Sequence, residues 1–242
     1  MSVYVYGVVR ASGAFPSDLR GVGDPPGAVR RLAAGPVAAA VGAAPTGLRA
    51  RRRDLQAHQD VLLALGGSGP VLPMRFGVVA DDEETVRARL AEAAEEYRAA
   101  LDRVAGRVEM NVRATPVDHG LAEIVRQDDH LRRLREEARS RPGFEVSVRL
   151  GEAVAAAVTR RAARAAGEVL AALAETGHEV SHGPEQAGWV LNASFLVPVD
   201  GVAAFRAAVD RLSAQHGGSA ALQVTGPLPC YSFAAAPEPV AV

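Results

Sequence analysis

The sequence predicts an α+β protein of two domains, because of its length, its mixture of segment types and the order of those segments after residue 106. The chain has 242 residues, enough for two buried cores. Short β-branched runs alternate with stretches in which apolar residues recur every three or four positions, the periods of strands and amphipathic helices. We predict an N-terminal mixed α+β domain over 1–105, a C-terminal domain over 106–233 and a flexible tail over 234–242.

The first part of the chain predicts a strand, a hairpin and a helix in succession. Ser2 to Val9 is β-branched and aromatic, which is typical of a buried strand, and a Gly/Pro-rich loop follows it. Residues 29–44 predict two short strands that turn at Gly35-Pro36. Asp54 is the expected cap of an amphipathic helix that ends at Gly66-Gly67. The expected apolar face of this helix comprises Leu55, Leu62 and Leu65.

A further strand and a long helix complete the predicted N-terminal domain. Val71 to Val79 predicts a strand, and Pro73 places it at a sheet edge or a bulge because proline cannot donate a ladder hydrogen bond. Its expected inward face comprises Leu72, Met74, Phe76 and Val78. The acidic run from Asp81 to Glu84 suits the positive end of a helix dipole. The helix that it opens has apolar residues from Val86 to Val104 and ends at Gly106.

The segments after residue 106 follow the order of a ferredoxin-like fold. The predicted strands cover 107–115, 178–181, 188–199 and 221–225. Two helical stretches, separated at Pro142-Gly143, lie between the first two strands, and one helix from Val202 to Leu212 precedes the last strand. The order βαββαβ predicts an antiparallel sheet with helices on one face.

Composition excludes several classes of function. The 27 basic and 28 acidic residues give a net charge of −1, so we predict no nucleic-acid partner and no membrane partner. The chain contains no lysine, and the arginines between Arg49 and Arg53 are interpreted as a solvated surface. Cys230 is the single cysteine and cannot form an internal disulfide. The chain starts without a signal-peptide pattern, and no apolar run reaches the roughly 18 residues of a membrane span. We expect an intracellular, soluble protein.

One short motif spells a zinc-protease signature. His178 to His182 reads H-E-x-x-H, in which both histidines must lie one turn apart on a continuous helix to bind one metal. Gly177 and Gly183-Pro184 flank the motif and favour a strand or turn. In a strand the two histidines would lie about 13 Å apart. We interpret the match as a coincidence and predict no metal site, no cofactor and no catalytic residue; a zinc hydrolase through His178 and His182 is a remote alternative.

Three segments stand out in their order along the chain: Tyr4 to Val8, Val71 to Gly77, and Gly226 to Phe233, with Asn192 to Val197 before the last helix. Together they resemble the gas vesicle protein GvpF/GvpL family. Each is weakly specific alone, but their order and spacing extend over nearly the whole chain. Cys230 departs from the family pattern, which usually has proline at that position.

The resemblance implies a non-enzymatic accessory protein of gas vesicle formation with two α+β domains, the second ferredoxin-like. Its implied partners are the major shell protein, contacted during nucleation or assembly, and further gas vesicle accessory proteins, with a location at the gas vesicle or in the cytoplasm. The alternative function is a small-ligand or regulatory binding module, because ferredoxin-like folds have many functions.

Three further side chains are predicted to be structural or to contact a partner. Arg75 lies in an otherwise apolar predicted strand, and we favour a buried or half-buried arginine paired with a carboxylate; the other interpretation is a partner contact. Trp189 and Phe195 are expected on one core-facing side of a strand.

Overall fold

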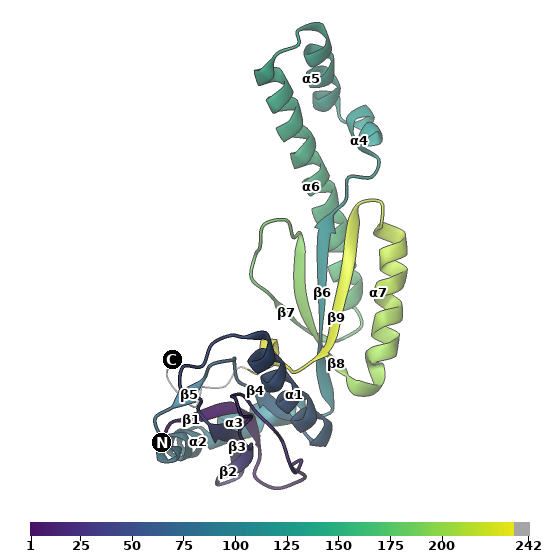
Figure 1. Cartoon of the computed structure of the whole chain (residues 1–242). Coiled ribbons are helices and arrows are strands. Elements are labelled where there is room, and N and C mark those ends of the chain that lie inside the picture. Colours follow the sequence, from purple (N-terminus) through teal and green to yellow (C-terminus); the bar gives the residue numbers. More distant parts are fainter. Residues whose placement is uncertain (235–242) are drawn as a thin grey trace. The chain divides into compact units, whose positions relative to one another are not determined.

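The computed structural model describes residues 1–234 (Figure 1), and contacts between residues divide them into two compact units. The first unit comprises residues 1–109 and 196–199 and the described residues from 226 onward; the second comprises 110–195 and 200–225. Apart from Ala234, the predicted tail lies outside the described residues. The division between 105 and 106 stays a prediction about where the domains separate.

An antiparallel sheet forms the centre of the first unit. Its strands are β1 (Val3–Arg10), β2 (Arg30–Ala34), β3 (Val37–Ala43), β4 (Val71–Pro73) and β5 (Val79–Ala80). The order is β2-β3-β1-β4, and β5 also pairs with β1. The hairpin expected at Gly35-Pro36 is confirmed, since β2 pairs with β3 and Gly35 adopts a φ of 62°, a conformation that glycine adopts without a steric penalty.

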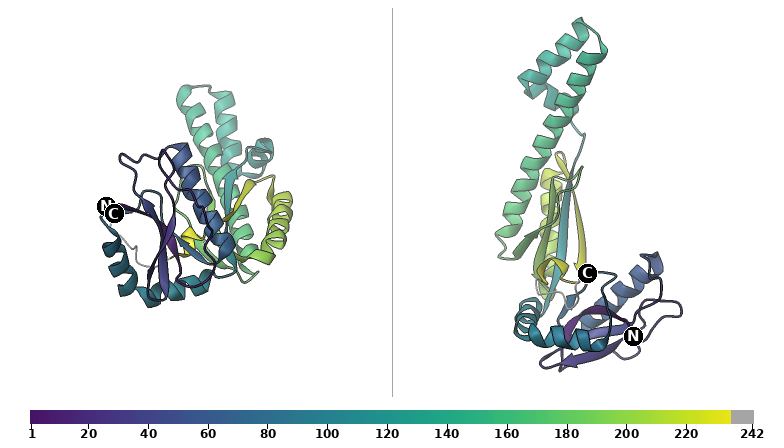
Figure 2. Two further views of the ribbon diagram at one scale, coloured as in Figure 1. Left: turned by 60° about the horizontal axis from the view of Figure 1, so that its bottom comes forward. Right: turned by 90° about the vertical axis from the view of Figure 1, so that its left-hand side faces the viewer.

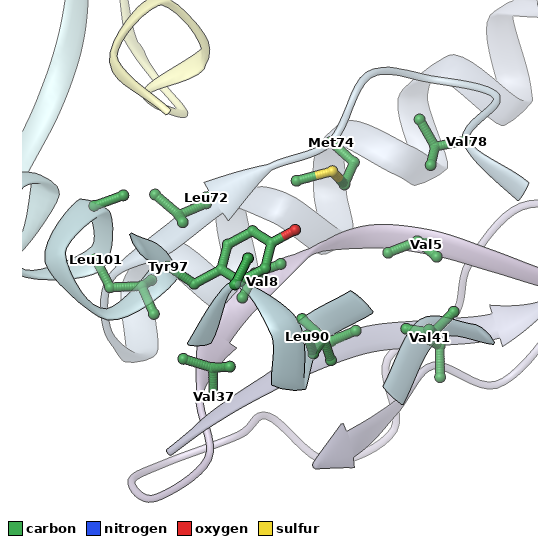
Figure 3. Packing of buried hydrophobic residues seen from close by; sticks show 14 of the residues in the cluster. Val5, Val8, Val37, Val41, Leu72, Met74, Val78, Leu90, Tyr97 and Leu101 are labelled. Carbon is green, nitrogen blue, oxygen red and sulfur yellow. The ribbon is translucent and has the colours of Figure 1, made fainter. Parts of the chain in front are cut away.

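Helices cover both faces of this sheet. On one face, α1 (Arg52–Ser68) packs on the side chains of Tyr4 and Tyr6. On the other face, α2 (Glu83–Glu92) and α3 (Ala94–Val104) pack on Val5 and Val8. Figure 3 shows this second cluster, in which Leu72, Leu90, Tyr97 and Leu101 gather around the strand residues. Both sides of β1 are therefore buried, as its continuous apolar sequence predicts.

A bulge in β1 explains why the alternation of its side chains shifts. The register with β3 slips between Val5 and Gly7, so Val5 and Val8 face one side although they are three residues apart. Gly7 is required at this point, because a Cβ there would lie 2.7 Å from the Leu72 carbonyl oxygen.

The predicted strand 71–79 is wrong in its middle. β4 ends at Pro73, and the chain turns at Phe76 and Gly77 before β5. Gly77 has a φ of 95°, and its amide donates to the Tyr4 hydroxyl at 3.1 Å. The alternation of apolar residues resembles a single strand, but the left-handed backbone at Gly77 interrupts it.

Two helix predictions also need correction. The single helix expected after the acidic run, with apolar residues from Val86 to Val104, is broken at Ala93, which separates α2 from α3. Asp54 is not a cap: α1 is preceded by Arg51, and the buried Asp54 carboxylate instead accepts the Gly23 amide at 3.0 Å. Leu55 was expected on the apolar face, but it is 42% exposed.

The second sheet confirms the ferredoxin-like prediction. Its strands are β6 (Arg107–Pro116), β7 (Glu179–His182), β8 (Leu191–Pro198) and β9 (Ala220–Leu228), in the order β7-β8-β6-β9. The connections between them contain α6 (Phe144–Ala174) and α7 (Val202–His216). Phe195 of β8 lies against Phe205 of α7, with 5.2 Å between ring centroids.

A helical extension projects from the ferredoxin-like part of the second unit (Figures 1 and 2). It consists of α4 (Leu121–Gln127), α5 (Asp129–Ser140) and the first half of α6. The first predicted helical stretch is thus two helices, because Asp128 interrupts it and accepts the amides of His130 and Leu131 at 2.9 and 3.2 Å. These hydrogen bonds lower the pKa of Asp128.

Candidate functional site

The histidines of the zinc-like motif lie in and beside a strand. β7 covers Glu179 to His182, which confirms the predicted strand. The His178 ring contacts the Phe205 ring at 5.7 Å between centroids. Residues four positions apart in a strand lie about 13 Å apart, so this backbone does not bring the two imidazoles to one metal as a helix would. Among residues 1–234, no three His, Cys, Asp or Glu side chains gather as metal ligands would.

Cys230 is positioned as a structural thiol. It is 4% exposed, and its Sγ lies 3.7 Å from the Arg107 carbonyl oxygen. Burial, together with the nearby Glu109 charge, raises the pKa of the thiol to about 12. The reactive thiolate is therefore strongly disfavoured near neutral pH.

Arg75 and Trp189 do not occupy the predicted core positions. Arg75 is exposed between the end of β4 and the Gly77 turn, and within residues 1–234 it has no carboxylate partner. The favoured interpretation of a buried ion pair is wrong, because the strand that would have buried Arg75 ends at Pro73. Trp189 precedes β8 and is half-buried under Arg113, whose guanidinium carbon lies 4.4 Å from the ring centroid. Phe195 is fully buried, as predicted.

A buried histidine network, not anticipated from the sequence, holds the first unit together. The Tyr4 hydroxyl donates to His58 Nδ1 at 2.9 Å, and His58 Nε2 donates to the Met74 carbonyl oxygen at 3.1 Å. This tautomer follows because a carbonyl oxygen can only accept. Burial lowers the pKa of His58. The hydrogen bonds of this network join β1, α1 and the β4–β5 connection, which is a structural role.

The segment after β9 is anchored to the first unit by a buried carboxylate. Glu109 is 4% exposed and accepts hydrogen bonds from the Ser232 amide at 2.8 Å and the Ser232 hydroxyl at 2.7 Å. Phe233 is buried in the same core as Val5 and Leu101. These contacts fix the preceding residues 227–230 within the first unit.

An apolar groove lies beside this anchored segment and is formed entirely by residues of the first unit. Its volume is about 540 Å³. Its main apolar lining residues are Leu62, Leu63, Val71, Val104, Val199 and Leu228. Leu63 and Val199 are 45% and 59% exposed, so the groove presents two large apolar side chains to solvent.

Glycines at the end of α1 leave room for this groove. Gly66, Gly67 and Gly69 line it, and a Cβ added at Gly67 or Gly69 would meet no atom within 4 Å. Arg107 is the charged residue among the lining residues. An apolar hollow with few charges is suited to bind aliphatic or aromatic side chains, whose transfer from water is favourable.

Comparison with known proteins gives a consistent result along the chain. The family model described as "Gas vesicle synthesis protein GvpL/GvpF" matches residues 2–235. Gas vesicle protein F of Streptomyces sp. (strain CB03234) is 44% identical over 237 residues, which are 96% of this chain and 99% of that protein. Gas vesicle protein L of the same organism is 34% identical over 166 residues, 58% of this chain and 61% of that protein.

Two solved structures have the same fold. The crystal structure of GvpF from Microcystis aeruginosa aligns with a TM-score of 0.73, and that of GvpF from Anabaena sp. PCC7120 with a TM-score of 0.70. Each is 21% identical in sequence, and each alignment covers 96% of this chain and 98% of the other. The likeness supports the α+β architecture described above.

Proposed function

Because the chain belongs to the gas vesicle synthesis protein GvpL/GvpF family, we propose that it is a non-enzymatic accessory protein that contacts the major shell protein during vesicle nucleation or assembly. The family resemblance predicted from the sequence is confirmed. We propose further that the protein acts in the cytoplasm, at the forming vesicle. None of the helices within residues 1–234 has both the length and the apolar character needed to cross a bilayer.

The apolar groove is the observation that supports this proposal. A shell protein that must be kept from premature polymerisation has apolar surface to cover, and the groove offers an apolar lining with Leu63 and Val199 partly exposed to solvent. Each large apolar side chain that a partner buries there contributes about 1.5–3 kcal/mol before the cost of association. Two or three such side chains would contribute about 3–9 kcal/mol, which is comparable to the cost of association, so the groove favours a weak and reversible contact rather than a permanent one.

Apolar coverage has a characteristic salt dependence. The net charge of −1 gives little long-range attraction, and one charged residue, Arg107, lines the groove. At about 0.5 M salt the Debye length is about 4 Å, so exposed ion pairs are screened while apolar contacts persist. Binding of the shell protein should therefore survive that salt concentration.

Two matched substitutions on α1 test the groove. Leu63→Glu places a charge at the groove, whereas Leu55→Glu makes the same change on the same helix at a residue that does not line it. Both leucines are partly exposed, so both variants should keep their fold. In a pull-down with purified shell protein, the Leu63 variant should lose binding and the Leu55 variant should retain it. Equal binding by the two variants would show that the groove is not the contact.

A deletion experiment tests the function itself. Removing the gene from a vesicle-forming host without a second family copy should abolish or sharply reduce vesicles, and the Leu63→Glu variant should restore fewer vesicles than the Leu55→Glu variant. Adding the purified protein to the shell protein should delay its aggregation. Normal vesicles in the deletion strain would refute the proposed function.

A further inference from the structure

A cluster of arginines lies at the end of the helical extension. Residues 130–150 contain six arginines and three glutamates, a net charge of +3 in a chain whose net charge is −1. Arg132 pairs with Asp129, and Arg149 pairs with Glu137. Within residues 1–234 the remaining four arginines are exposed and have no carboxylate partner. They are Arg133, Arg135, Arg139 and Arg141.

An exposed aromatic side chain lies next to these arginines. Phe144, the first residue of α6, is 88% exposed, and Val148 one turn later is 39% exposed. Phe144 and Val148 together leave apolar area open to solvent beside the arginines, and a partner that covers this area gains free energy from its burial. We call Arg133, Arg135, Arg139, Arg141 and Phe144 the cationic tip.

The first unit carries a surface of the opposite charge. Residues 81–96 contain seven carboxylates and two arginines, a net charge of −5. Six of the carboxylates are exposed, on α2, on α3 and just before α2. Glu83 and Glu84 share Arg87, and Glu95 pairs with Arg98. Asp81, Glu92 and Glu96 have no cationic partner within residues 1–234. We call residues 81–96 the acidic ridge.

We propose that the cationic tip of one copy of this protein docks on the acidic ridge of a second copy. The two surfaces have opposite charge and similar length: Arg133 and Arg139 lie about 9 Å apart along α5, and Glu84 and Glu92 about 12 Å apart along α2, at 1.5 Å per residue. Opposite charges on two protein surfaces increase the rate of encounter and fix the orientation of the complex. Phe144, at the start of α6, adds an apolar contact beside the charged pairs.

The symmetry of this contact differs from that of a simple dimer. The tip and the ridge are different surfaces, so each copy keeps a free tip or a free ridge after one contact forms. Such heterologous contacts close into rings or continue as open chains. A self-associating accessory protein could present several apolar grooves together, but the contact does not use the groove and does not depend on the proposed function.

Charge reversal tests the pairing of the two surfaces. The tip variant carries Arg133→Glu, Arg135→Glu and Arg139→Glu, and the ridge variant carries Asp81→Arg, Glu92→Arg and Glu96→Arg. By sedimentation velocity at low salt, the native protein should self-associate with increasing concentration. Each variant alone should associate at least about 10-fold more weakly, because like charges then face each other.

Restoration distinguishes a specific contact from a damaged fold. An equimolar mixture of the tip and ridge variants should associate again, because the reversed tip of one then faces the reversed ridge of the other. A single chain that carries all six substitutions should also self-associate. A control variant carries Arg49→Glu, Arg51→Glu and Arg52→Glu, all at exposed positions. It has the same change in net charge as the tip variant and should associate like the native protein.

Several results would overturn the proposal. A native protein that stays monomeric at low salt would refute it, and so would a mixture of variants that fails to associate. A different occupant would be identified if the native protein does not self-associate but binds phosphatidylserine vesicles or a dT oligonucleotide, and the tip variant loses that binding. The tip would then bind lipid or nucleic acid instead of a second copy. Two results separate this proposal from the groove proposal. Leu63→Glu should weaken shell-protein binding but leave self-association unchanged. Added salt should weaken self-association but leave shell-protein binding unchanged.

Discussion

Acidification should destabilise the first unit through His58. Its imidazole is 3% exposed, is stacked against Tyr6 and is hydrogen-bonded at both nitrogens. At present Nδ1 accepts the hydrogen bond from the Tyr4 hydroxyl, and the oxygen of that hydroxyl accepts the Gly77 amide. Protonation would place an N–H on Nδ1, so the hydroxyl proton would lose its acceptor. The charged form therefore loses a hydrogen bond as well as its hydration.

The sign of the effect follows from the lowered pKa of His58. The unfolded chain binds the proton more readily, with a histidine pKa of about 6.5. The stability that neutral His58 contributes is thus fully present above that pH and is lost as the pH falls toward the folded pKa. Over this window the free energy of unfolding falls by about 1.4 kcal/mol for each pH unit. In a domain of roughly this size, that loss lowers the melting temperature by about 5 °C.

Thermal unfolding of the native protein and of His58→Gln between pH 7 and pH 5 measures this effect. Glutamine can still donate to the Met74 carbonyl but does not titrate. The variant should be less stable at pH 7, and the difference in melting temperature should narrow toward pH 5, because the carboxylates and the other histidines titrate equally in both proteins. A difference that stays constant with pH would refute the assignment of His58 as a buried neutral histidine.

Three further substitutions or reactions follow from the structure. Trp189→Ala should cost only about 1–2 kcal/mol, because the half-buried ring loses a cation–π contact and part of its buried area; a loss above about 3 kcal/mol in thermal unfolding would instead indicate a core position. Cys230, whose pKa is raised to about 12, should react with iodoacetamide much more slowly in the native than in the denatured protein, and equal rates measured by mass spectrometry would contradict its burial. Arg75→Glu should change stability by less than about 0.5 kcal/mol, because the side chain is exposed. The partner contact, which is the remaining sequence interpretation of Arg75, predicts that shell-protein binding in a pull-down falls in this variant; unchanged binding would exclude that role.

The sequence predicts those elements whose local signals agree with the tertiary structure. The hairpin at Gly35-Pro36 and the ferredoxin-like order after residue 106 follow from turn residues and periodicity, and both are confirmed. The predicted strand 71–79 fails because its alternation continues through Gly77, where the left-handed backbone ends it. The break at Ala93 has no local signal, since alanine has the highest helix propensity.

The candidate site was largely invisible in the sequence, because distant segments build it. The groove combines the end of α1 with Val104, Val199 and residues 227–230, and no periodicity links them. The glycines after Leu65 were the one local signal, since a helix that ends in residues without side chains leaves space beside it. His58 and Glu109 were missed because a buried polar residue is recognised by partners that fold against it from elsewhere in the chain.

The anchoring of Ser232 and Phe233 in the first unit has a consequence for synthesis. The first unit takes strands from the beginning of the chain but completes its core with Cys230 and Phe233, so the second unit is inserted within it. On the ribosome, residues 110–225 emerge and can fold while the first unit still lacks its last core side chains. The groove, which needs residues 227–230, forms only after that point. A nascent chain therefore has no completed groove with which to engage an apolar partner, and binding is delayed until both units have been translated.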